Sequence, residues 1–196
     1  LYVAPEEIST TGISAITLDD INFATKINCG MKLLAVFLNN DGCAKPSAYV
    51  APHYVSKNSM LAPVEDVFNG IIVEGNALGE AMFYGKGAGK LPTASAVVGD
   101  ILEAAMPPEK NSTTKNWYAG EEGVRVTTMP EDIVVDIVVK AAPSKADALK
   151  AAFANYETEL VCDDSEATAI IVKKIAHKDI EAACASVDGK WLHYMA

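Results

Sequence analysis

The order of apolar segments in the second half of the chain constrains its fold more than any other feature of the sequence. Residues 132–140 are rich in Ile and Val, the pattern of a buried strand. Apolar side chains recur at helical spacing in residues 144–155, where Ser144 is placed to cap a helix. The same reading predicts two strands, a helix and a last strand at 157–162, 167–173, 178–187 and 190–195. This β-α-β-β-α-β order predicts the ferredoxin-like sandwich.

The first half of the chain predicts a mixture of helices and strands. A helix is expected at residues 18–26, where Asp19 or Asp20 caps or favours the N-terminus. A second helix is expected from Pro92 to about Ala105, because proline suits the first turn of a helix. Strands are predicted at 31–38, 47–55, 67–74 and 78–84, with Gly75-Asn76 as a hairpin turn between the last two.

The composition changes abruptly between Met106 and Gly123, where turn and linker residues replace apolar ones. We therefore expect a first domain at residues 1–105, a linker at 106–122 and a second domain at 123–196. The expected fold class is α/β (α+β), with a mixed-sheet segment followed by a ferredoxin-like domain.

The charge of the chain argues against two classes of partner. The net charge is −10 and no cluster of basic residues is present, so neither nucleic acid nor an anionic membrane surface is expected as a partner. No apolar run approaches the roughly 20 residues that a membrane-spanning helix needs. We expect a cytoplasmic protein.

The cysteines and histidines give no sign of a metal site. Cys29, Cys43, Cys162 and Cys184 contain no C-x-x-C pair, so they are expected to be buried, reduced thiols. The three histidines lie far apart in the sequence and form no ligand pair at helical spacing. Each is expected to be a surface or capped side chain, and the three are His53, His177 and His193.

A glycine-rich stretch joins the fourth predicted strand of the first half to the following helix. Residues 85–90 fit neither the phosphate-binding P-loop pattern nor the dinucleotide fingerprint, because the glycine spacing differs from both. Three glycines let a backbone approach another molecule closely, and the amides at a helix start can donate to an oxyanion or a sugar hydroxyl. The alternative is a simple tight turn, which spacing alone favours modestly.

The segment Tyr84–Gly89, followed by Pro92–Asp100, resembles the signature of the homoserine dehydrogenase family. Further collinear similarity extends over residues 12 to about 104 and includes Ser59–Val64. The resemblance implies an oxidoreductase that reduces L-aspartate 4-semialdehyde to L-homoserine with NADPH or NADH, in threonine and methionine biosynthesis. It implies a homo-oligomer whose subunits pair through this region. It also implies that the nicotinamide cofactor lies against Gly87, Ala88 and Gly89, with Thr93 a weaker candidate.

Most of the machinery that the resemblance implies has no counterpart here. The N-terminal nucleotide-binding fold and the lysine-bearing substrate segment lie upstream of Leu1, so we expect a fragment or a processed chain. Lys32 lies on an apolar strand and does not match the family's catalytic lysine, so no catalytic residue is assigned. This chain alone is expected to be inactive and to bind no cofactor tightly.

The C-terminal domain resembles an ACT domain, an amino-acid-sensing module whose effector binds between the first strand and first helix. The corresponding residues here are Pro143, Ser144 and Lys145, and L-threonine is the effector that the resemblance implies. The glycine and the acidic residue of the usual loop are absent, which slightly favours a degenerate fold kept for dimer contacts over a working site. A free-standing amino-acid sensor or scaffold without catalysis is the alternative to an enzyme fragment, and a phosphate- or nucleotide-binding module is a third reading.

Overall fold

The computed structural model describes residues 8–38, 47–107, 127–128 and 133–196, which form parts of two compact units. The first unit combines residues 1–59 with residues 120–196, and the second comprises residues 60–119. Two features predicted from the sequence lie outside the described residues, namely Cys43 and all of the expected linker except Met106 and Pro107.

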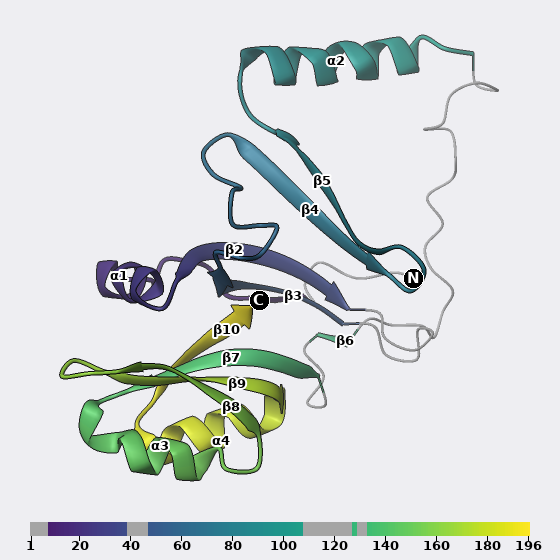
Figure 1. Cartoon of the computed structure of the whole chain (residues 1–196). Coiled ribbons are helices and arrows are strands. Elements are labelled where there is room, and N and C mark those ends of the chain that lie inside the picture. The colour runs from purple at the N-terminus through teal and green to yellow at the C-terminus, as the bar shows by residue number, and fades with distance from the viewer. Residues whose placement is uncertain (1–7, 39–46, 108–126, 129–132) are drawn as a thin grey trace. The chain divides into compact units, whose positions relative to one another are not determined.

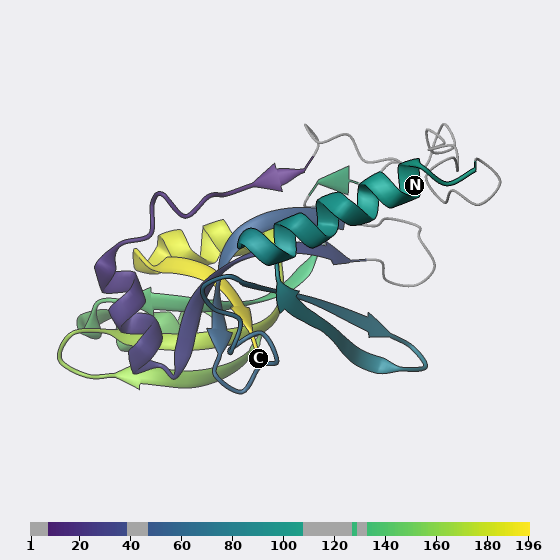
Figure 2. The same ribbon diagram turned by 90° about the horizontal axis from the view of Figure 1, so that it is seen from above.

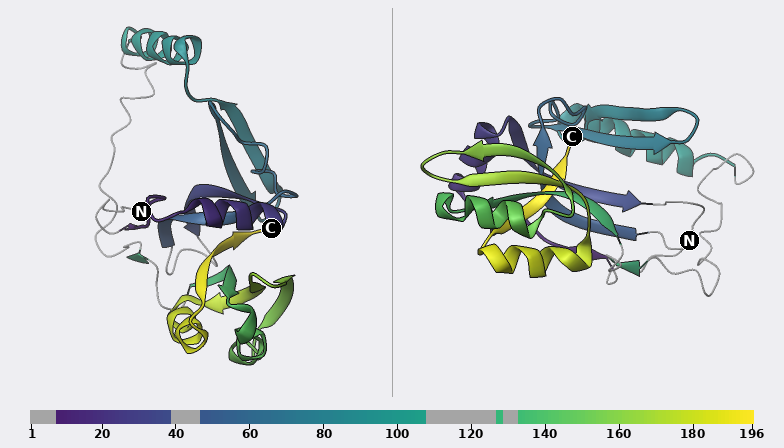
Figure 3. Two further views of the ribbon diagram at one scale, coloured as in Figure 1. Left: turned by 90° about the vertical axis from the view of Figure 1, so that its left-hand side faces the viewer. Right: turned by 60° about the horizontal axis from the view of Figure 1, so that its bottom comes forward.

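The second half of the chain confirms the predicted β-α-β-β-α-β order. Its elements are β7 (Val134–Ala141), α3 (Ala146–Ala152), β8 (Glu157–Asp163), β9 (Thr168–Ala176), α4 (His177–Val187) and β10 (Lys190–Met195). The four strands pair antiparallel in the order β10-β7-β9-β8. Figures 1 and 3 show α3 and α4 side by side on one face of this sheet.

The start of the first helix in this half differs from the prediction. Pro143–Lys145 form a short 3-10 turn, and α3 begins at Ala146 with Lys145 as its N-cap, so Ser144 does not cap it. The reason is local, because the Lys145 amide donates to the Ala142 carbonyl at 2.9 Å and closes a tight turn before the helix begins.

Strands from the first half of the chain extend the same sheet. They are β1 (Ser9–Thr10), β2 (Cys29–Leu38), β3 (Ser47–Ser56) and, from the middle of the chain, β6 (Thr127–Thr128). β2 and β3 form an antiparallel pair over their whole lengths, whereas β10 pairs with β3 in parallel through three residue pairs, including His193 with His53. The sheet is therefore mixed, as predicted.

The two faces of this sheet carry separate cores because successive side chains of a strand point to opposite sides. On β7, Ile137 and Val139 belong to the core under α3 and α4, where Phe153 is the largest fully buried side chain. Val138, between them, belongs to the core on the other face, which contains Phe23 of α1 (Leu18–Lys26). Figure 2 shows α1 beside the strands of this unit.

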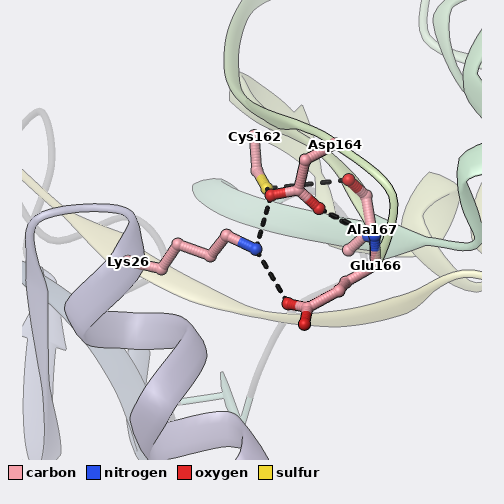
Figure 4. A network of polar contacts seen from close by, with 5 residues as sticks. All are labelled: Lys26, Cys162, Asp164, Glu166 and Ala167. Carbon is pink, nitrogen blue, oxygen red and sulfur yellow. Dashed lines mark hydrogen bonds and ion pairs between the residues drawn. The ribbon is translucent and has the colours of Figure 1, made fainter.

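Ionic contacts at both ends of α1 hold it against the sheet. At its start, Thr17 and Asp20 form a capping box, and Lys190 of β10 donates to both Asp20 carboxylate oxygens at 2.8 and 2.7 Å. At its end, Lys26 forms ion pairs with Asp164 and Glu166 in the β8–β9 turn (Figure 4). The Lys26 ammonium is the main cause of a lowered pKa at the Asp164 carboxyl.

Replacing Asp20 with alanine is expected to destabilise the first unit by about 1 to 2 kcal/mol, from the lost cap and a half-exposed ion pair. Burial alone would raise the pKa of the Asp20 carboxyl, but hydrogen bonds from Lys190 and Thr17 outweigh it and lower the pKa. Chemical denaturation at neutral pH measures the loss. Asp19→Ala, an exposed position in the same turn, is the control, and equal losses for the two variants would contradict the assignment.

The second unit contains a hairpin and a helix, namely β4 (Phe68–Gly75), β5 (Gly79–Lys86) and α2 (Lys90–Ala104). The predicted hairpin is confirmed, with pairing from Phe68–Lys86 to Gly75–Gly79, but its turn is formed by residues 76–78 rather than by Gly75-Asn76, because Gly75 still pairs as the last residue of β4 and Gly79, with a positive φ of 72°, begins β5. α2 begins two residues earlier than predicted, which places Pro92 third in the helix, still within its first turn.

Three of the four cysteines are described, and all three are free and buried, as predicted for Cys29, Cys162 and Cys184. Burial raises the pKa of the Cys29 thiol to about 11, so it is protonated at neutral pH. Among the described helices, none is long and apolar enough to cross a membrane.

Candidate functional site

The glycine-rich stretch forms the connection between β5 and α2, and residues 85–90 are here named the glycine turn. Gly85 and Lys86 end the strand, and the helix begins at Lys90. The amide of Gly87 donates to the Val67 carbonyl at 3.0 Å, which extends the hairpin pairing by one hydrogen bond. Every residue of the turn is exposed, so its backbone faces an open surface.

Gly89 has a backbone conformation that only glycine adopts readily. Its φ of 119° and ψ of 160° lie in a region where an L side chain clashes with its own backbone. Gly89 is the N-cap of α2, and its carbonyl accepts a hydrogen bond from the Thr93 amide at 3.1 Å. Because glycine supplies no side-chain cap, the amides of Lys90 and Leu91 remain available to an outside acceptor.

Gly87 is required for a different reason, because another side chain occupies the space beside it. A Cβ atom built on Gly87 would lie 1.6 Å from Nδ2 of Asn69. Asn69 stands on β4 directly opposite Gly85 of β5. The turn is thus packed against Asn69 on one side and open on the other.

An open hollow of about 530 Å³ adjoins the turn. Aromatic rings near it form a small cluster, in which Phe68 and Tyr84 stack at 4.8 Å and the Lys86 ammonium lies 5.7 Å from the Phe68 ring centroid. The residues that line the hollow are Asn69, Ile71, Met82, Phe83, Tyr84, Gly85, Lys86 and Gly87. Apolar and aromatic walls with an amide and an ammonium suit a flat, polar-edged ring that carries anionic groups.

The four predicted cofactor residues lie close together. Gly87, Ala88 and Gly89 are consecutive in the connection between β5 and α2, and the amide of Thr93, in the first turn of α2, donates a hydrogen bond to the Gly89 carbonyl. Asn69 is not among the residues that the sequence predicted for the cofactor site. Its position opposite Gly85 depends on a hairpin register that the predicted Gly75-Asn76 turn does not give, so no local pattern identified it. Among the described residues, no three His, Cys, Asp or Glu side chains lie together as metal ligands do.

The predicted effector residues lie on the β7–α3 connection. Ser144 and Lys145 are exposed and Pro143 is half-buried. Their 3-10 turn lies at the carboxyl end of β7, the position that the resemblance implies for an effector.

Two histidines contradict the expectation that each is a surface or capped side chain. His53 of β3 and His193 of β10 are both buried, and their rings stack at 4.8 Å. Tyr49 stacks on His193 at 5.0 Å, and Trp191 meets it edge-on at 5.3 Å. Burial lowers the pKa of His53, and burial followed by the charges of His53 and His177 lowers that of His193 to about 3.

Comparison with known proteins identifies what the chain is similar to. A family model described as homoserine dehydrogenase matches residues 1–102. Homoserine dehydrogenase of Bacillus subtilis is 37% identical over 128 residues, which are 65% of this chain and 29% of the relative. That of Corynebacterium glutamicum is 43% identical over 106 residues, 53% of this chain and 24% of the relative.

Solved structures extend the similarity to nearly the whole chain. Homoserine dehydrogenase of S. aureus at pH 8.5 is 28% identical with a TM-score of 0.68, over 97% of this chain and 47% of that one. The enzyme from Thiobacillus denitrificans, 21% identical with a TM-score of 0.70, covers 96% of this chain and 48% of its own and shares the fold. The chain therefore spans about half the length of these structures, and its matches cover about a quarter of the curated relatives.

Proposed function

Because this chain belongs to the homoserine dehydrogenase family, we propose that it forms part of an enzyme that reduces L-aspartate 4-semialdehyde to L-homoserine. The cofactor in this proposal is NADPH or NADH, held mainly by an N-terminal nucleotide-binding region outside this chain. The product serves threonine and methionine biosynthesis in the cytoplasm. The residues of this chain that approach the cofactor are Gly87, Ala88, Gly89 and Thr93.

The conformation of Gly89 is the single observation that carries the proposal. A φ of 119° with a ψ of 160° is costly for any other residue, and here it aims bare backbone amides at open space. A tight turn that only reverses the chain direction does not need an exposed, uncapped helix start. A planar nicotinamide and its ribose can approach such a backbone at van der Waals distance because no Cβ intervenes.

The chemistry of this chain's own residues is binding and orientation rather than proton transfer. The glycine turn positions the cofactor, and its amides donate to polar atoms of the ligand. The cofactor supplies the hydride when it is bound. A lysine upstream of Leu1 handles the proton in the proposed complete enzyme, so this chain alone is inactive and binds nucleotide weakly.

Exposed apolar side chains in the second unit support a homo-oligomer and burial against the N-terminal region. Ile71 and Phe83, which face each other across the hairpin, are 63% and 67% exposed, and Leu91 on α2 is 82% exposed. A water-exposed apolar surface of this kind is typical of an interface. In this proposal the segment that precedes residue 105 pairs the subunits.

A hybrid enzyme tests the proposal directly. The chain is joined to the N-terminal region of the Bacillus subtilis relative in place of the segment that it matches, and NADPH consumption is followed with L-aspartate 4-semialdehyde. We expect turnover by the hybrid and none by this chain alone. A folded, oligomeric hybrid that neither binds NADPH nor turns over would overturn the proposal in favour of a non-catalytic sensor or scaffold.

For the ferredoxin-like domain, we propose a degenerate ACT fold that makes dimer contacts and does not sense L-threonine. The absence of a glycine and an acidic residue beside Pro143, Ser144 and Lys145 supports this choice. Calorimetric titration of the chain with L-threonine should show no binding heat. Saturable heat at millimolar threonine or below, abolished by Ser144→Ala or Lys145→Ala, would instead establish a working effector site.

A further inference from the structure

We propose that Asn69 is the positioning residue of the glycine turn, so that its side chain sets where the turn's backbone meets the nicotinamide nucleotide. This inference rests on the proposed function. Asn69 does not itself contact the reacting atoms, and it acts on them by positioning the glycine turn. Its physical basis is the contact between Asn69 and Gly87.

The tightest restriction on space at Gly87 comes from the side chain of Asn69. The three heavy atoms nearest to a Cβ built on Gly87 all belong to Asn69, with Nδ2 at 1.6 Å, Cγ at 2.9 Å and Oδ1 at 3.6 Å. Gly87 has no positive φ, since Gly79 and Gly89 are the described glycines in that region. Glycine is therefore needed at position 87 for space, whereas at position 89 it is needed for conformation.

The register of the hairpin explains how Asn69 reaches the turn. Asn69 lies opposite Gly85. Because Gly85 has no side chain, the side-chain amide of Asn69 has room to extend over the end of β5 toward Gly87. On the strand side, the Gly87 amide is fixed to the Val67 carbonyl at 3.0 Å. The hydrogen bond and the Asn69 side chain thus restrict Gly87 from two directions. The position of Gly87 in turn determines where the backbone of Ala88 and Gly89 lies.

The Asn69 side chain acts by packing. Within the part of the chain that the structure describes, it makes no hydrogen bond, so its amide is not committed to another protein group. It lines the hollow beside the turn, together with Tyr84 and Lys86. Removing the side chain would free the Gly87 backbone to move toward the vacated space, away from the position that the ligand requires.

The first test is made on this chain without any cofactor. We expect Asn69→Ala to speed hydrogen exchange at the Gly87 amide about tenfold or more, because local opening becomes easier. The isosteric Asn69→Asp should keep exchange within about twofold of the native rate, since shape is preserved. Asn76→Ala, the same substitution at the far end of the hairpin, is the matched control. Unchanged exchange in Asn69→Ala would overturn the inference.

The second test uses the hybrid enzyme and a double-mutant comparison. Asn69→Ala should raise the KM for NADPH about tenfold, while kcat and the KM for the semialdehyde change by less than about twofold. Gly87→Ala should impair NADPH binding in the native background and do so less in the Asn69→Ala background, because the steric conflict is gone. Additive effects of the two substitutions would contradict the packing role.

The two proposals fail in distinguishable ways. If the native hybrid is inactive but Asn69→Ala speeds exchange at Gly87, the turn is positioned as inferred and the proposed function is wrong. If the native hybrid is active but Asn69→Ala changes neither exchange nor the KM for NADPH, the proposed function stands and the role of Asn69 is refuted.

Discussion

Replacing Gly89 with alanine is expected to raise the KM of the hybrid enzyme for NADPH about 10- to 100-fold, the equivalent of about 1 to 3 kcal/mol of backbone strain. The φ of 119° at this position is strained for alanine whatever space surrounds it. The turn must therefore move to relieve the strain, and the amides at the start of α2 move with it. Initial rates at varied NADPH concentration measure the effect.

Gly75→Ala provides the matched control for this prediction. Gly75 lies at the opposite end of the same hairpin, has no positive φ, and a Cβ there would meet no atom within 4 Å. We expect its kinetics to match those of the native hybrid. A native KM in Gly89→Ala would show that the turn does not carry the cofactor.

Acidification from pH 7 to pH 5 is expected to lower the free energy of unfolding of the first unit by about 2 kcal/mol through His193. Its pKa is about 3 in the folded chain, against 6.5 for the free side chain, because it is buried beside His53 and His177. The unfolded chain therefore takes up the proton first. This contribution to stability is complete above about pH 6.5 and declines as the pH falls toward 3.

Denaturant unfolding at a series of pH values measures this effect, with His193→Phe as the diagnostic variant. Phenylalanine keeps an aromatic ring beside Tyr49 and Trp191 but cannot titrate, so the dependence between pH 7 and 5 should become shallower. His53, whose pKa burial also lowers, accounts for the remainder. A native chain whose stability is flat over this interval would contradict the buried, neutral state of the pair.

Local sequence patterns predicted the elements well because helix and strand periodicities act over a few residues. The continuous Ile- and Val-rich run identified the β7 strand, because β7 is buried on both faces, with Ile137 and Val139 in one core and Val138 in the other. The Thr17–Asp20 capping box also follows a readable spacing, although Asp19 or Asp20, and not Thr17, was expected to cap or favour this helix start. The misplaced cap at Ser144 arose because a proline-containing turn precedes the helix.

Contacts between distant segments could not be predicted in the same way. The parallel pairing of β3 with β10 brings His53 onto His193, and no local pattern specifies a pairing between the first and last parts of a sheet. Candidate-site residues fall into the same two groups. The glycine turn was visible in the sequence, whereas the contact of Asn69 with Gly87 depends on the exact register of two strands.

The measurement that tests the central claim most directly is the response of glycine amides to NADPH in the hybrid enzyme. This chain contains 13 glycines, which can be isotope-labelled within its own segment and observed by NMR. We expect the amide signals of Gly85, Gly87 and Gly89 to shift on saturation with NADPH, while those of Gly30 and Gly189 in the first unit do not. Saturation that leaves the turn glycines unmoved would contradict the central claim.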